Sequence, residues 1–124
     1  MTTGKQVFST ITSDGQLELG IADVEIKAPG PDDVLVRIEA APINPSDMGP
    51  LFGPASIAEA KLQDAKLIAP VPENRLGMVA SRLDQTLPVG NECAGTVIST
   101  GESGAAKALD GKLVSIMPGA SFAQ

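Results

Sequence analysis

Residues 87–101 have the sequence LPVGNECAGTVISTG, and this stretch decides the fold. It begins with a Pro/Gly entry, passes through Glu92, and continues as a run of small and apolar residues that ends at Gly101. A run of this kind, bounded by glycines, predicts a buried strand. Glu92 stands at the mouth of that strand, where a half-buried carboxylate needs a partner. Gly95 inside the run predicts a bulge or a second backbone passing close to the strand.

The clearest period of two in the chain covers residues 34–40, which have the sequence VLVRIEA and predict a second strand. This strand ends at Pro42 and is followed by the segment Asn44-Pro45-Ser46-Asp47. Because proline fits the first turn of a helix, this segment predicts a turn that leads into a short helical piece.

Further short strands are predicted on both sides of these two. Residues 5–12 form the first, and a Ser-Asp-Gly turn leads into the next, whose apolar residues keep one phase up to Ile21 and change phase at Val24. That change predicts a bulge or break near residues 22–23. A helical turn at residues 105–109 and strands at 112–117 and 120–124 complete the pattern. Short strands, glycine turns and little helix predict a mainly β fold with short helices, arranged as a barrel or a sandwich.

Residues 55–86 do not follow this pattern. Ser56 and Glu59 have the spacing of a capping box, which predicts a short helix at residues 57–62. A second helix is predicted further on, because four apolar residues recur at helical spacing: Leu76, Val79, Ala80 and Leu83.

The composition narrows the possible functions. With 124 residues the chain fits one domain, and its core must be aliphatic, since 43% of the residues are hydrophobic but only three are Phe and none is Trp or Tyr. A net charge of −6 disfavours nucleic acid and anionic membranes as partners. Without a secretory signal or a membrane-length apolar run, we expect a cytoplasmic protein. Cys93 is the single cysteine, which excludes an internal disulfide and favours a small core residue over a nucleophile.

Two of these stretches resemble the medium-chain dehydrogenase/reductase superfamily. Gly90-Asn91-Glu92 stands where that family has Gly-His-Glu, and residues 34–47 are similar to the valine-rich strand and Asn-Pro-Ser-Asp segment of its zinc-independent, quinone oxidoreductase-like branch. The resemblance implies that residues 1–124 are the N-terminal substrate-side (catalytic) domain, a partly open β-barrel similar to the GroES co-chaperonin. Residues 55–86 would then be an insertion, and the barrel would be incomplete.

The same resemblance implies an NAD(P)H-dependent oxidoreductase that reduces quinones or conjugated carbonyls by hydride transfer. NADPH or NADH would be bound mainly by a dinucleotide-binding domain, which is missing here because no Gly-x-Gly-x-x-Gly occurs in the sequence. We therefore expect a fragment that is inactive alone, from an enzyme that as a whole could form a homodimer. With no His or Tyr in the chain, the proton donor has to be water, the substrate or the rest of the enzyme.

No zinc and no other metal site are expected. Zinc-dependent members of the resembled family supply ligands at the positions of Ala41 and Asn91, and neither side chain is a zinc ligand. Cys93 lies on the predicted buried strand, so the three ligands of a catalytic zinc cannot be assembled.

The resemblance places the site residues on the two motifs. Asn44 and Asp47 are expected to be catalytic, with Asn44 also facing the nicotinamide of the cofactor. Asn91 and Glu92 are expected to line the substrate pocket as a polar pair. Phe52 lies outside the two motifs, and its place in the glycine-rich loop after Met48 predicts that it lines an apolar part of the same pocket. Each has a structural alternative, because Asn and Asp commonly cap turns, Asn91 and Glu92 suit a strand entry, and Phe52 suits a core.

A function of another class stays open, namely a stand-alone interaction module similar to a co-chaperonin. Such a protein needs a mobile glycine-rich loop that carries an aliphatic triplet. The loop after Met48 contains Leu51-Phe52 but no clear triplet, and we therefore favour the oxidoreductase domain.

Overall fold

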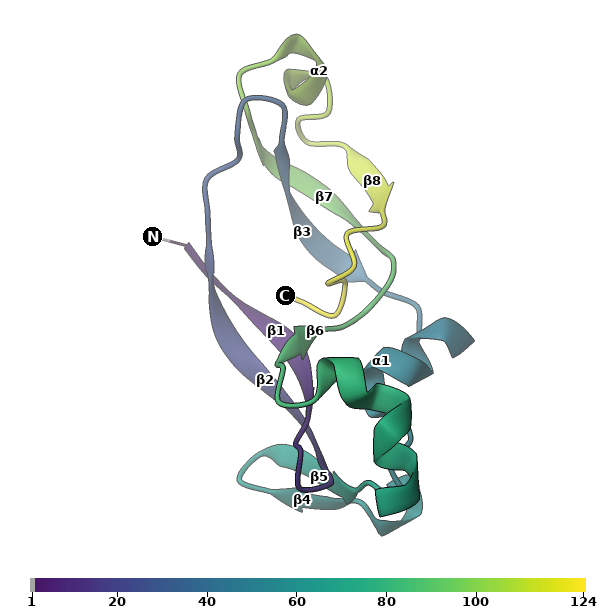
Figure 1. The fold of residues 1–124 in the computed structure, drawn as a ribbon. Coiled ribbons are helices and arrows are strands. Elements are labelled where there is room, and N and C mark those ends of the chain that lie inside the picture. Colours follow the sequence, from purple (N-terminus) through teal and green to yellow (C-terminus); the bar gives the residue numbers. More distant parts are fainter. Residues whose placement is uncertain (1) are drawn as a thin grey trace.

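A computed structural model describes residues 2–124 and contains two antiparallel sheets (Figure 1). The first has the strand order β4-β5-β2-β1-β6 and the second β3-β7-β8. The strands of the first sheet are β1 (Thr2–Ile11), β2 (Gln16–Ile26), β4 (Lys61–Gln63), β5 (Lys66–Pro70) and β6 (Leu87–Pro88). Those of the second are β3 (Val34–Ala40), β7 (Cys93–Thr100) and β8 (Leu113–Ile116). The prediction of a mainly β fold with short helices is confirmed, and over residues 2–124 the sheets do not close into a barrel.

The helices are short and lie in the connections between strands. They are η1 (Pro45–Asp47), α1 (Met48–Phe52), η2 (Ile57–Glu59), η3 (Glu73–Arg82) and α2 (Gly104–Lys107). The helix predicted at residues 57–62 is wrong in its second half. Ser56 makes no side-chain cap bond, and the backbone at Ala60 turns to an extended conformation, which leads directly into β4. Within residues 2–124 no helix has the length and apolar character needed to cross a membrane.

The main core lies where the β1–β2 hairpin meets residues 55–86. Its buried centre consists of Ile11, Leu17, Ala69 and Val71. Around it pack Phe52, Leu67, Leu76, Val79 and Leu83, so that three of the four residues of the predicted helical stripe face the core. Full burial of a Leu or Ile side chain contributes about 1.5–3 kcal/mol to stability. Residues 55–86, which the sequence set apart from the other strands, therefore supply about half of this core.

The second strand is regular, and the bulge predicted near residues 22–23 is wrong. β1 and β2 pair without interruption from Thr2 opposite Ile26 to Ile11 opposite Leu17. The apolar residues of β2 change face because the β1–β2 hairpin extends beyond the main core, so that the two halves of β2 have different neighbours. Leu17 points into the core, whereas Val24 and Ile26, further along β2, line a separate cavity of about 310 Å³ beside β3.

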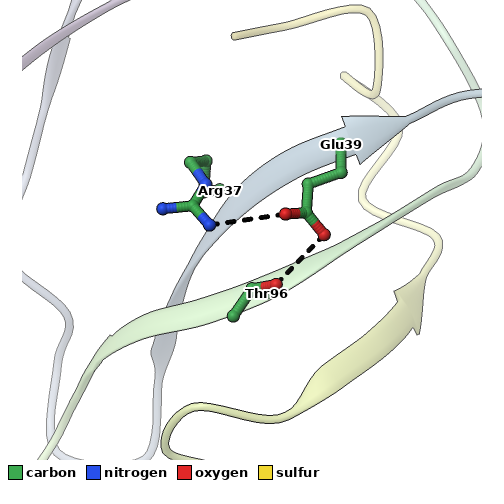
Figure 2. Close-up of polar contacts among 3 residues, drawn as sticks. All are labelled: Arg37, Glu39 and Thr96. Carbon is green, nitrogen blue, oxygen red and sulfur yellow. Dashed lines mark hydrogen bonds and ion pairs between the residues drawn. The ribbon is translucent and has the colours of Figure 1, made fainter.

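The pairing of β3 with β7 explains Gly95. A side chain at this position would collide with the carbonyl oxygen of Arg37, and the register shifts between Ile38 and Ala40. The close backbone approach predicted at Gly95 is therefore confirmed. On the exposed face of the same pair, Glu39 accepts hydrogen bonds from Arg37 Nη2 at 3.3 Å and from Thr96 Oγ1 at 3.0 Å (Figure 2).

The last residues of the chain return to β1 (Figure 1). The amide of Val7 donates to the carbonyl of Phe122 at 2.9 Å, and Lys5 and Gln124 exchange two hydrogen bonds of 2.7 Å. The strand predicted at residues 120–124 is present as an isolated bridge between Gln6 and Ala123. This C-terminal segment covers part of the edge of β1 that β6 leaves open.

Candidate functional site

The side chain of Asp47 joins the two motifs that the sequence singled out. Asp47 ends η1 and has no exposed surface. Its Oδ2 accepts a hydrogen bond of 2.7 Å from the backbone amide of Asn44, which closes the turn around Pro45. Its Oδ1 accepts one of 3.1 Å from the backbone amide of Asn91, at the entry to β7. One carboxylate therefore holds together two segments that are 44 residues apart in the sequence.

Two side-chain contacts connect the same segments. Asn44 Nδ2 donates to Glu92 Oε1 at 3.1 Å, and Asn91 Nδ2 donates to the hydroxyl of Ser46 at 2.8 Å. Asn44, Asn91 and Glu92 are half-buried, so each keeps part of its surface accessible to a ligand. We call Asn44, Ser46, Asp47, Asn91 and Glu92 the polar cluster.

The backbone before Asn91 is fixed by Gly90 and the C-terminal segment. Gly90 has a φ of +100°, which favours glycine, and a Cβ there would lie 2.7 Å from the backbone nitrogen of Phe122. The amide of Ser121 donates to the Gly90 carbonyl, and that of Phe122 to the Val89 carbonyl, both at 3.2 Å. The turn that presents Asn91 and Glu92 therefore rests against the end of the chain.

Phe52, the fifth predicted site residue, is part of the hydrophobic packing. It packs against the core formed by Ile11, Leu17, Ala69 and Val71. This contact matches the structural alternative for Phe52. The structure thus joins Asn44, Asp47, Asn91 and Glu92 by hydrogen bonds, whereas Phe52 packs against the core.

Sequence reasoning missed Arg82, a half-buried cation in η3 that contacts α1. Its Nη1 donates to the carbonyls of Gly49 and Pro50 in α1, at 3.3 and 3.1 Å, and its Nη2 donates to Ser9 Oγ at 3.0 Å. Burial lowers the pKa of the Arg82 guanidinium from its ordinary value. Arg82 therefore holds η3 against α1. Helix α1 directly follows, in the sequence, the segment that carries Asn44 and Asp47. An arginine at the end of a predicted helix gives no sequence signal for contacts to residues more than 30 positions away.

Ala41 and Asn91, the two positions at which no zinc ligand was expected, have different surroundings. Ala41 lines a cavity of about 420 Å³ between the sheets, and Asn91 belongs to the cluster itself. The Cys93 side chain is buried. No group of three or more His, Cys, Asp or Glu residues with the placement of a metal site occurs among residues 2–124.

The chemistry available to the polar cluster is hydrogen bonding. It offers two amides, one hydroxyl and the carboxylate of Glu92, whereas Asp47 is enclosed and acts only on the position of its neighbours. An arrangement of this kind can bind and orient a polar group of a ligand, and it contains no activated nucleophile.

No protein-family model matches the sequence, and no curated protein matches it.

Proposed function

We propose that this chain is the substrate-side domain of a zinc-independent, NAD(P)H-dependent oxidoreductase that reduces quinones or conjugated carbonyls. In this proposal the domain is a GroES-like member of the medium-chain dehydrogenase/reductase superfamily, in the quinone oxidoreductase-like branch. The full enzyme would act on small carbonyl or quinone substrates.

One observation carries the proposal. The two stretches that resemble this family lie far apart in the sequence, and the contacts Asn44–Glu92 and Asp47–Asn91 connect them directly. Two unrelated coincidences of sequence would have no reason to meet at one polar cluster.

In this proposal each residue of the cluster has a defined role. Asn44 contacts the reacting ligands, since the residue is only half-buried and Glu92 fixes the orientation of its amide through Nδ2. Asn91 and Glu92 form the polar wall of the substrate site, and Asp47 is a positioning residue. Phe52 is left out because it packs into the core.

The cofactor is proposed as NADPH or NADH. When bound, it supplies the hydride, so the protein contributes binding and orientation. The residues described here offer the nicotinamide end the amide of Asn44. The sequence contains no glycine-rich turn for the phosphates, and we therefore assign these to a separate dinucleotide-binding unit.

The co-chaperonin alternative receives less support from the segment after Met48. That segment forms α1, in which Leu51 is only 6% exposed, and Phe52 packs against the core. An interaction loop needs apolar residues that are free to contact a partner.

The test is quinone-dependent oxidation of NADPH by the longest form of the protein that its gene encodes, with duroquinone as the acceptor. Asn44→Ala is expected to lower kcat/KM roughly ten- to hundredfold, the range for a lost hydrogen bond to a charged or reacting group. Asn74→Ala, at an exposed asparagine in η3, is the matched control and should leave kcat/KM unchanged. Absence of any quinone reduction, or equal rates for the two variants, would rule the proposal out.

A further inference from the structure

Gly90 stands directly before Asn91, in the turn that leads into the polar cluster. Glycine has no Cβ and adopts more backbone conformations than any other residue, so it does little by itself to fix a turn. The polar cluster needs this turn in one conformation, because the amide of Asn91 donates to Asp47 Oδ1 at 3.1 Å and its side chain donates to Ser46 Oγ at 2.8 Å. A neighbouring residue therefore has to hold the turn.

The backbone of Phe122 links the turn to β1. Its amide donates to the carbonyl of Val89 at 3.2 Å, and its carbonyl accepts a hydrogen bond of 2.9 Å from the amide of Val7. Two further hydrogen bonds, of 2.7 Å each, join Lys5 to Gln124 and fix the same segment two residues further along. One residue of the C-terminal segment thus connects the first sheet with the turn before the polar cluster.

The ring of Phe122 fills the space beside Gly90. A Cβ at position 90 would lie 2.9 Å from Cδ1 and 3.0 Å from Cγ of this ring, so the ring occupies the place that a side chain would take. Phe122 is half-buried, as are the other two phenylalanines of the chain, Phe8 and Phe52. The ring therefore limits the backbone of Gly90 from outside, where the glycine has no side chain to do so.

We propose that Phe122 is a positioning residue of the polar cluster. Its backbone ties the turn to β1, and its ring keeps the glycine of the turn in place. The two residues that follow, Asn91 and Glu92, then remain within hydrogen-bond distance of the Asn-Pro-Ser-Asp segment. The effect on substrate binding rests on the proposed function, in which Asn91 and Glu92 form the polar wall of the substrate site.

Phe122→Ala tests this role in the chain itself, by hydrogen exchange measured with NMR. Without the ring the turn opens more often, so the amide of Asn91 should exchange about tenfold faster relative to the amide of Val97. Val97 is the internal reference, since its amide donates to the carbonyl of Lys112 at 2.9 Å in the second sheet. The side-chain amide signals of Asn44 and Asn91 should shift as well, because both groups donate within the cluster. Phe122→Leu, which refills most of the space, should restore the ratio of exchange rates to within about threefold of the original.

Phe8→Ala is the matched control. It truncates a half-buried aromatic residue of β1 that lines a different cavity, of about 190 Å³, together with Glu18 and Lys66. It should lower the stability of the whole protein in the same way as Phe122→Ala, and it should leave the ratio of exchange rates for Asn91 and Val97 unchanged.

The effect on the site is measured in the duroquinone assay described above. Phe122→Ala should lower kcat/KM for the quinone about tenfold, because small displacements of orienting groups are costly. Phe122→Leu should recover most of this loss, and Phe8→Ala should keep the original kcat/KM.

Two results would overturn the positioning role: an unchanged ratio of exchange rates in Phe122→Ala, or an equal rise in Phe8→Ala, which would reduce the effect to a general loss of stability. If Phe122→Ala does not fold, the same two criteria apply to Phe122→Val. A raised ratio with an unchanged kcat/KM would overturn the effect on substrate binding. A protein that reduces no quinone would overturn the proposed function alone, because the exchange rates are measured without substrate.

Discussion

The carboxylate of Asp47 has no contact with solvent and accepts two backbone hydrogen bonds from separate segments. Bonds from backbone amides to a carboxylate are charge-assisted and stronger than bonds between neutral groups. The bond to Asn44 is local, and a sequence predicts it because Asp commonly closes such turns. The bond to Asn91 depends on how the sheets pack, which no local pattern reveals.

Asp47→Asn tests this role. An amide presents one oxygen and one NH₂ group, so one of the two backbone donors would face another donor. We expect the free energy of unfolding to fall by about 2–3 kcal/mol, measured by urea denaturation. Asp32→Asn, at an exposed turn residue, is the control and should change stability by no more than about 0.5 kcal/mol. Equal stabilities for the two variants would contradict the bridging role.

Arg82 offers a second test at the scale of one residue. Arg82→Met keeps much of the apolar stem and removes the bonds to the carbonyls of α1, so we expect a loss of about 1–2 kcal/mol. The end of α1 should loosen as well, seen as faster hydrogen exchange at the Gly53 amide, which donates to the Gly49 carbonyl at 2.8 Å. The same substitution at exposed Arg75, in the same helix, should do neither.

At the scale of elements, the β4–β5 hairpin turns in only two residues. Asp64 and Ala65 have φ values of +49° and +61°, which a two-residue turn of this kind requires at both central positions. Alanine is a poor choice there, because its Cβ is strained in the left-handed region. The hairpin was missed in the sequence for this reason, since the usual glycine signal of the turn is absent.

Ala65→Gly is therefore expected to stabilise the protein by about 1 kcal/mol, measured as a shift of the urea midpoint. The same substitution at Ala108, an exposed residue with a φ of −64° at the end of α2, should lower stability by about 0.5–1 kcal/mol. A destabilising effect at both positions would show that the turn gains nothing from glycine.

For the whole molecule, the sequence predicted most strands but not how they meet. The period of two located β3, and the glycine-bounded run located β7, because both patterns are local. The phase change of apolar residues in β2 led to the wrong prediction of a bulge. The strand is regular, and its apolar residues change face because its two halves have different neighbours. The same limit applies to the polar cluster: four of its residues were singled out, whereas their mutual contacts and those of Arg82 depend on packing across the fold.

The return of residues 120–124 to β1 has a consequence for the order in which the protein forms during synthesis. The C-terminal segment that pairs with β1 is synthesised more than a hundred residues after β1, because Lys5 pairs with Gln124. Until then part of the β1 edge is uncovered, and the Gly90 turn lacks the support of Ser121 and Phe122. Unpaired strand edges readily join other chains. A nascent chain of this protein would thus be most vulnerable to aggregation just before these residues emerge.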